Sequence, residues 1–349
     1  MSQQTLSEVK EYYGKVLKGT KDLQTNACCS TESIPDSHKK ALAQIDTEIL
    51  DKYYGCGSPI PPALEGATVL DLGCGTGRDV YLASKLVGEN GHVIGLDMTD
   101  EQLDVARKHQ DSQAKAFGFS KSNVTFTKGY IEDLKAAGIE DNSVDLVISN
   151  CVINLSPDKD KVYQEIFRVL KPGGEMYISD VFSDRRIPES LRQDPVLYGE
   201  CLSGALYVED FRRTLVACGI ADFRVTSQRP ITIENPEIED KIGHIDFSSI
   251  NVRAFKLGLE DVCEDYGQIA RYKGTIQDNP SYFDLDDHHR FESKKPVLVC
   301  GNTADMLSKS RYAKHFEVTG DKSTHYGFFD CSDTEHETSS DCGEGSSCC

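Results

Sequence analysis

The stretch "VLDLGCGTGRD" (Val69–Asp79) decides the fold of this chain. It begins as a short apolar run of the kind that parallel sheets bury, and a glycine-rich turn then leads into the start of a helix. The glycines at 73, 75 and 77 allow a sharp turn and a close approach of the backbone to a ligand, and we expect a side chain at Gly73 or Gly75 to clash. The spacing Gly-x-Gly-x-Gly differs from the Gly-x-Gly-x-x-Gly of dinucleotide-binding folds, so a pyrophosphate cradle is disfavoured.

Strand-like and helix-like segments alternate around this turn, from residue 67 to residue 180. The strand-like segments are "ATVLDLG", "GHVIGLD", "NVTFTKG", "SVDLVIS" and "GEMYISD". Such alternation is the signature of a doubly wound, mostly parallel sheet. The second strand ends at Asp97, where a carboxylate can accept both ribose hydroxyls of an adenosine.

The remaining segments are divided by changes in composition and pattern. We expect an N-terminal helical segment (1–58), the alternating domain (59–180), an insertion with the end of that domain (181–229), a small C-terminal α+β domain (230–330) and a tail (331–349). The segment "SSINVRAFKL" is interpreted as a strand of the small domain. The tail "CSDTEHETSSDCGEGSSCC" is acidic and rich in Ser and Gly, which predicts disorder.

The overall composition excludes several classes of partner. The 38 Lys and Arg residues are outnumbered by 57 Asp and Glu residues, and the resulting charge of −19 repels nucleic-acid backbones. No run of 18 apolar residues and no signal-like apolar segment occurs, so we expect a cytoplasmic protein with no membrane span. We also expect a monomer. Thirteen cysteines in such a chain are more typical of ligands, redox groups or core fillers than of a disulfide framework.

Four segments in a fixed order carry a family resemblance. "DLGCGTG", "GLDMT", "GYIEDL" and "SNCVINL" resemble the class I S-adenosylmethionine-dependent methyltransferases, over residues 67–180. The resemblance implies a Rossmann-like fold with Asp71 and Gly73 near the methionine part, Asp97 at the ribose, Met98, Ile131 and Glu132 around the adenine, and the backbone of Asn150 closing the site. The full set of cofactor positions it implies is Tyr54, Gly55, Asp71, Gly73, Cys74, Gly75, Arg78, Asp97, Met98, Ile131, Glu132, Asn150 and Val152.

Four cysteines lie at positions that are not typical of buried core residues. Cys151 follows a buried strand, Cys56 and Cys201 lie in glycine-flanked loops beside tyrosines, and Cys28 lies in a polar N-terminal segment. Their spacing matches no zinc-finger pattern, so a zinc site is only a weak alternative. Convergence of distant thiols on one pocket is instead what a soft ion requires. The others outside the tail, apart from Cys29, are interpreted as small hydrophobic fillers: Cys74, Cys218, Cys263 and Cys300.

At this point the chain resembles a narrower family, the arsenite methyltransferases. The segments that carry the resemblance are "TNAC", "YYGCG", "SNCVINL", "GECLSGALY", "FKL" and "SRYAKHF", and they span residues 20–320. The resemblance implies that Cys28, Cys56, Cys151 and Cys201 are functional, that the last three bind As(III), and that Cys28 and Cys56 form a redox pair reset by glutathione or thioredoxin. Because Cys29 adjoins Cys28, either of the two remains open as the first member of that pair.

The chemistry implied by the resemblance needs no general base. Three thiolates leave one lone pair on arsenic, which attacks the activated methyl group, so positioning supplies most of the catalysis. Glu200 is considered as a helper for ligand protons. The expected products are mono- and dimethylated arsenic with a little trimethylated arsenic. The tail thiols are interpreted as adventitious, with electron supply or arsenic collection as the alternative.

Two other functions remain open from the sequence. The first is a C- or O-methyltransferase of the ubiquinone type, in which the cysteines are core residues. The second is a thiol-rich protein that sequesters metalloids on a vestigial fold.

Overall fold

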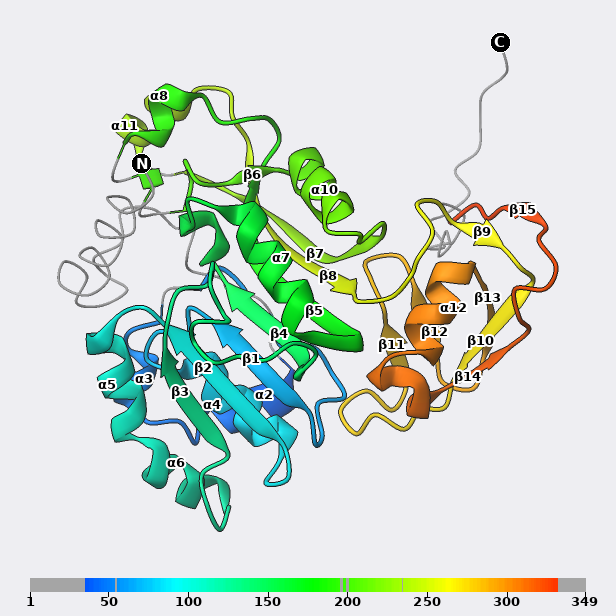
Figure 1. The fold of residues 1–349 in the computed structure, drawn as a ribbon, viewed down its shortest axis with the longest axis horizontal. Coiled ribbons are helices and arrows are strands. Elements are labelled where there is room, and N and C mark those ends of the chain that lie inside the picture. The colour runs from blue at the N-terminus through cyan, green and yellow to red at the C-terminus, as the bar shows by residue number, and fades with distance from the viewer. Residues whose placement is uncertain (1–34, 54, 195–196, 199–200, 234, 332–349) are drawn as a thin grey trace, which may run out of the picture.

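The computed structural model describes residues 35–331 apart from 54, 195–196, 199–200 and 234. Its main sheet contains β1 (Thr68–Leu72), β2 (His92–Asp97), β3 (Val124–Lys128), β4 (Val144–Asn150), β5 (Leu170–Ser183), β6 (Leu206–Tyr207), β7 (Phe223–Ile231) and β8 (Phe247–Phe255). The strand order is β3-β2-β1-β4-β5-β8-β7, with β6 beside β5 (Figure 1). Strands β1 to β6 pair in parallel, whereas β8 pairs antiparallel with β5 and with β7. The predicted doubly wound, mostly parallel sheet is confirmed.

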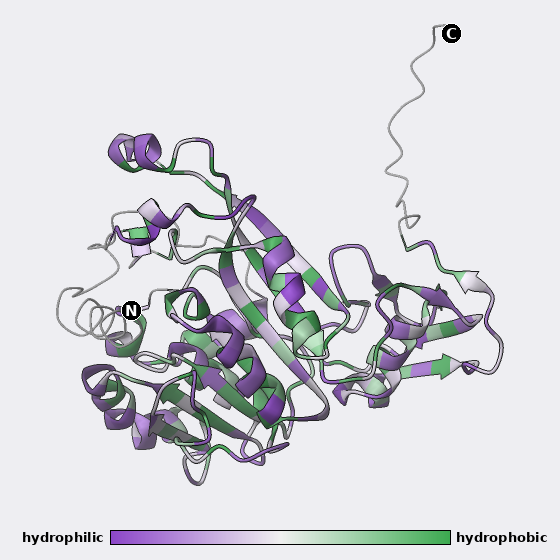
Figure 2. Ribbon diagram, turned by 45° about the horizontal axis from the view of Figure 1, so that its top comes forward, coloured by the Kyte–Doolittle hydropathy of each residue, from purple (hydrophilic) through white to green (hydrophobic). Residues whose placement is uncertain are grey.

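Helices cover both faces of this sheet. The helices of this part of the chain are α2 (Asp36–Leu42), α3 (Thr47–Leu50), α4 (Arg78–Val87), α5 (Asp100–Lys108), α6 (Gln110–Phe117), α7 (Lys159–Val169), α8 (Glu189–Arg192), α10 (Val208–Ala217) and α11 (Pro236–Ile242), with a 3-10 turn η3 (Ile153–Leu155). Of these, α8 buries no residue and lies beyond the end of the sheet with α11 (Figure 1). Leu70 packs in one core with α7 and α10, while the adjacent Val69 packs in a second core with α2, α3, α4 and α5. Burial on both faces explains the continuous apolar runs of β1 and β4, and Figure 2 shows hydrophobic residues gathered on these central strands. No helix of the described ranges is long and apolar enough to cross a bilayer.

The segment "SSINVRAFKL" forms a strand, but this strand belongs to the main sheet. In β8, residues Phe247–Phe255 pair antiparallel with Ser183–Glu175 of β5. The assignment of this segment to a separate small domain is therefore wrong, and the expected boundary at residue 230 falls inside β7. Because β8 lies between two other strands and is buried along nearly its whole length, it belongs to the same core as the parallel strands.

The C-terminal part contains short antiparallel sheets and two helical segments. Its elements are β9 (Glu264–Asp265), β10 (Gln268–Tyr272), β11 (Tyr282–Asp284), β12 (Arg290–Glu292), β13 (Pro296–Val299), α12 (Gly301–Ser308), η4 (Arg311–His315), β14 (Phe316–Thr319) and β15 (Gly327–Phe328). The pairings are β13-β10-β14, β11-β12 and β15-β9, and they surround a core of their own. Figure 1 shows this part beyond β8, on the side of the molecule away from α5 and α6.

A buried carboxylate joins the main sheet to the C-terminal part. Glu175 of β5 accepts a hydrogen bond from Arg253 of β8 at 2.6 Å and is also paired with Arg311 of η4. Arg253 in turn donates to the hydroxyl of Tyr312 and to the carbonyl of Leu285, both at 2.6 Å. The Glu175 and Arg253 side chains are 0% and 1% exposed. The Glu175 carboxylate thus pairs with two guanidinium groups, that of Arg253 in the main sheet and that of Arg311 in the C-terminal part.

Candidate active site

The glycine loop joins β1 to α4, and its backbone is left-handed at Gly73, Gly75 and Gly77. A Cβ at Gly73 would lie 2.5 Å from a methyl carbon of Val152, so both space and the φ of +69° require glycine. The nearest neighbour of a Cβ at Gly75 would be Oε1 of Gln102, at 4.0 Å. A clash is therefore confirmed at Gly73. At Gly75 no described protein atom would meet a Cβ closer than 4.0 Å, and the clash expected there with a bound ligand stays a prediction.

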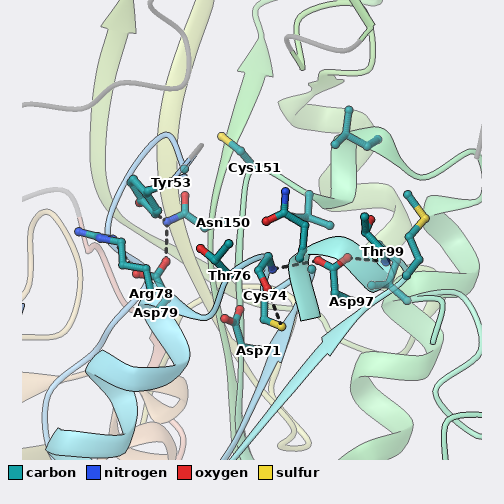
Figure 3. A pocket seen from close by; sticks show the side chains of 18 of the residues that line it. Tyr53, Asp71, Cys74, Thr76, Arg78, Asp79, Asp97, Thr99, Asn150 and Cys151 are labelled. Carbon is teal, nitrogen blue, oxygen red and sulfur yellow. Dashed lines mark hydrogen bonds and ion pairs between the residues drawn. The ribbon is translucent and has the colours of Figure 1, made fainter. Parts of the chain in front are cut away.

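A pocket lies over this loop, at the carboxyl ends of β1, β2 and β4, where open α/β sheets bind ligands (Figure 3). The predicted cofactor positions that line it are Gly55, Asp71, Gly73, Cys74, Gly75, Arg78, Asp97, Met98, Ile131, Glu132, Asn150 and Val152. The remaining predicted position, Tyr54, lies outside the described residues. The lining residues that the sequence motifs did not single out include Tyr53, Thr76, Asp79, Thr99, Gln102 and Ser156.

Two carboxylates face each other across the loop. Asp97, at the end of β2, accepts a hydrogen bond from the backbone N–H of Gly75 at 2.9 Å on one oxygen and from that of Thr99 at 2.8 Å on the other. Burial raises the pKa of Asp97, while these backbone donors lower it. Burial also raises the pKa of Asp71, and the nearby charges of Asp79 and Asp97 add to the effect. Hydrogen bonds from the Thr99 side chain and the Met98 backbone also lower the pKa of Asp97. A carboxylate at the end of this strand can accept from a ligand with two adjacent hydroxyls.

The side chain of Asn150 connects this pocket to the loop that carries Cys56. Its Oδ1 accepts hydrogen bonds from the backbone N–H of Cys56 at 3.0 Å and of Gly57 at 3.3 Å. Its Nδ2 donates to the hydroxyl of Tyr53 at 2.6 Å and to Asp79 Oδ2 at 2.9 Å (Figure 3). The sequence motifs indicated only a backbone role for Asn150 and missed this one, because the partners lie about 70 to 100 residues away in the chain.

The structure brings three predicted cysteines together in one cluster, of which Cys151 lines the pocket. Cys56, Cys151 and Cys201 are 0%, 3% and 0% exposed and pack in one cluster. Cys56 and Cys151 are joined by a disulfide with Cα atoms 5.8 Å apart, and the Cys201 thiol donates to the carbonyl of Cys151 at 3.2 Å. Cys28 lies outside the described residues. In this structure Cys56 is thus paired with Cys151 and not with Cys28, the partner expected from the family resemblance.

The backbone around these thiols is unusual. Cys151 and Cys201 have φ values of 57° and 64°, in the left-handed region that residues with a side chain seldom adopt. Such conformations persist only where the surrounding structure enforces them, and they cluster at functional sites. The two positions are therefore held for a reason other than local chain preference.

Two charged groups near Cys201 were not predicted. Burial lowers the pKa of Lys159 to about 8, and the proximity of Asp180 and of Cys201 raises it in part. Burial raises the pKa of Asp180 to about 7, against hydrogen bonds from the backbone of Val181 and Asn154 and the positive charge of Lys159. No sequence signal marked either residue, while Glu200, the helper considered above, lies outside the described residues.

Comparisons with known proteins agree with this geometry. A family model described as a methyltransferase domain matches residues 64–219, and one described as the arsenite methyltransferase C-terminal domain matches residues 267–349. The arsenite methyltransferase of Aquipseudomonas alcaligenes is 51% identical over 92% of this chain and 93% of its own length, and that of Homo sapiens is 44% identical over 89% and 83%.

A solved structure supports the same relation. The crystal structure of the arsenic(III) S-adenosylmethionine methyltransferase from Chlamydomonas reinhardtii is 54% identical and superimposes with a TM-score of 0.83, over 85% of this chain and all of that one. These matches cover both the main sheet and the C-terminal part. The main sheet thus has the class I methyltransferase fold, and the chain belongs to the arsenite methyltransferase family.

Proposed function

We propose that this chain transfers the methyl group of S-adenosylmethionine to trivalent arsenic bound by Cys56, Cys151 and Cys201. The observation that carries this proposal is the gathering of three buried sulfur atoms beside a pocket that Cys151 lines together with the glycine loop and Asp97. Arsenite would become monomethylated and then dimethylated arsenic, with a little trimethylated product. Such a reaction converts and detoxifies arsenic.

The pocket residues fit S-adenosylmethionine. Asp97 would accept the ribose hydroxyls, Met98 and Ile131 would pack against the adenine, and Glu132 would meet its edge. The bare backbone of Gly73, which a Cβ would fill, would lie against the methionine part together with Asp71. When bound, the cofactor supplies a methyl group on a sulfonium, which needs no further activation.

The three cysteines fit trivalent arsenic because this ion is soft and thiophilic. Arsenite would react with three thiols to form three As–S bonds and release three water molecules, with no change of oxidation state. The Cys56–Cys151 disulfide must first be reduced, which takes two electrons and two protons. Lys159 and Asp180 have pKa values of about 8 and about 7, close to neutral pH. They would therefore take up and release protons as the third thiol, Cys201, binds or releases arsenic.

A thiol reductant completes the cycle. Methyl transfer makes the arsenic formally pentavalent, and a pair of thiols can restore the trivalent state by forming a disulfide. Glutathione or thioredoxin would then reduce that disulfide by exchange. The requirement for reduced thiols supports a cytoplasmic location, and we propose that the chain acts as a monomer.

The direct test is incubation of the reduced protein with arsenite, a thiol and cofactor labelled on its methyl group. We expect label in mono- and dimethylated arsenic. A quinone-type methyltransferase would leave arsenite unlabelled, and its turnover would be unaffected by Cys→Ser at 56, 151 and 201. A sequestering protein would bind arsenite but fail to bind S-adenosylmethionine.

Asp97→Asn is expected to weaken binding of S-adenosylmethionine about 10- to 100-fold. The substitution keeps the size of the side chain but removes the charge that would receive the ribose hydroxyls, and charge-assisted hydrogen bonds contribute roughly 1.5–3 kcal/mol. Calorimetric titration with the cofactor measures the change. The control is Asp104→Asn, an exposed carboxylate of α5 outside the pocket lining. Equal affinity of Asp97→Asn and wild type would exclude the ribose role.

Cys28→Ser is expected to have a milder effect than loss of a proposed arsenic ligand. Its proposed task is reduction of methylated arsenic, so the variant should still methylate methylarsenite while producing less dimethylated arsenic from arsenite. Product speciation from the two substrates measures this split. Cys29→Ser is the matched control, and a reversed pattern between the two variants would assign the redox role to Cys29.

A further inference from the structure

Three cysteines outside the pocket also lie together. The Sγ atoms of Cys263, Cys300 and Cys331 are all within 4.8 Å of one another. The sequence interpretation of Cys263 and Cys300 as separate core fillers did not foresee this arrangement. Single buried cysteines commonly pack as small hydrophobic residues, but three converging sulfur atoms form a donor set.

Strand pairing brings distant parts of the chain to this place. Cys263 precedes β9, which pairs antiparallel with β15, and the N–H of Phe329 donates to the carbonyl of Cys263 at 2.8 Å. This pairing carries the chain past Cys263 to Cys331. Cys300 comes from between β13 and α12, where it is the N-cap residue of the helix. The three thiols are therefore fixed by a sheet pair and a helix start.

The Cys300 sulfur lies among hydrogen-bonding groups and close to a buried positive charge. The Cys300 side chain is fully buried; the sulfur accepts a hydrogen bond from the N–H of Thr303 at 3.5 Å, and the thiol donates one to the Thr303 hydroxyl at 3.3 Å. The buried guanidinium of Arg224 lies 3.5 Å from that hydroxyl. A thiolate is the form of cysteine that binds soft ions.

The number of donors favours one kind of ion. Zinc in structural sites takes four protein ligands, whereas within residues 35–331, gaps excepted, the cluster holds three cysteines with no fourth Cys, His, Asp or Glu. Trivalent arsenic needs only three sulfur ligands, because its lone pair occupies the position that a fourth ligand would take. Three thiolates also balance its charge, so the product is neutral and can lie in this partly buried place.

We propose that Cys263, Cys300 and Cys331 form a second site that binds trivalent arsenic, apart from the site of methyl transfer. Arsenite would form three As–S bonds and release three water molecules, with no reductant consumed. Figure 1 shows α12 and β9 in the C-terminal part, away from β1, β2 and β4, where the pocket lies. The site would thus retain the ion without methylating it. The existence of the trithiol site stands on geometry alone, while the choice of arsenic as its ion rests on the proposed function.

The test measures arsenic bound per chain in the reduced full-length protein after incubation with arsenite and gel filtration. Relative to wild type, Cys300→Ser and Cys263→Ser should each lose one tightly bound arsenic. Cys263 is only partly buried, so its variant keeps the test valid if Cys300→Ser fails to fold. Two controls should lose none from this site: Cys218→Ser, on the end of α10, and the triple variant Cys342→Ser, Cys348→Ser, Cys349→Ser. X-ray absorption in a Cys151→Ser background should show arsenic bound by three sulfur atoms, and this signal should disappear when Cys300→Ser is added.

The outcomes separate this inference from the proposed function. Equal arsenic content in Cys218→Ser and Cys263→Ser would overturn the second site, even if arsenite is methylated. A wild-type protein that produces no methylated arsenic, yet loses one arsenic on Cys263→Ser, would refute the proposed function and leave the second site standing. Zinc that stays on the purified chain, is lost in Cys263→Ser and is not displaced by arsenite would overturn the choice of arsenic.

Discussion

Cys151→Ser is expected to produce no detectable methylated arsenic from either arsenite or methylarsenite. A serine oxygen is hard and does not replace a thiolate as a ligand of trivalent arsenic. Without Cys151 the ion is not held beside the cofactor, and the reaction loses most of the roughly 7–11 kcal/mol that oriented proximity can supply. Product speciation after incubation with cofactor and a thiol reductant measures the loss.

The controls for this experiment distinguish loss of the ligand from loss of the fold. Cys201→Ser should behave in the same way, whereas Cys218→Ser, a half-buried thiol beside α10, should retain normal turnover. Cofactor affinity should survive in Cys151→Ser, because the ribose and methionine contacts proposed above do not involve its sulfur. Undiminished turnover of arsenite by Cys151→Ser would disprove the three-thiolate proposal.

Glu175→Gln is expected to lower the free energy of unfolding by about 3–5 kcal/mol. The substitution keeps the shape of the side chain but leaves Arg253, which is fully buried, and Arg311 without their carboxylate. Removing one partner from a buried ion pair has this cost because the remaining charge stays out of water without compensation. Equilibrium denaturation followed by circular dichroism measures the change.

The matched control for Glu175 is an exposed pair of the same chemistry. Glu317 lies 3.7 Å from Arg271, and both side chains are about half exposed. Glu317→Gln should leave the stability nearly unchanged, since solvent screens such pairs. Equal effects of the two substitutions would mean that the junction carboxylate does not hold the C-terminal part to the sheet.

Much of the fold could be predicted because short stretches of sequence indicate its strands and turns. The strands around Val69 and Leu146 carry apolar residues on both faces, and the glycine turn directly follows the first of them. The local sequence of a strand does not show which strands it pairs with. For this reason the sequence predicts the wrong sheet for the strand that ends at Phe255. Its alternating residues would fit either a small separate sheet or an edge of the large one.

The site was predictable to the extent that motifs carry it. The glycine loop and Asp97 have a characteristic spacing, and the resemblance to a family located Cys56, Cys151 and Cys201. The roles of the Asn150 side chain and of Lys159 could not be predicted, because they depend on contacts between segments far apart in sequence. The same holds for Cys263 and its two partners, whose separations match no metal-binding motif.

Cys56 and Cys151 can either form their disulfide or bind arsenic, so oxidation of this pair and binding of the substrate exclude each other. The two sulfur atoms that are bonded to each other cannot bind arsenic at the same time. Under the proposed function, the enzyme therefore responds to two conditions at once: arsenic must be present, and the cell must still have reducing capacity. A cell that exhausts its thiols under oxidative stress would lose this defence at the same moment.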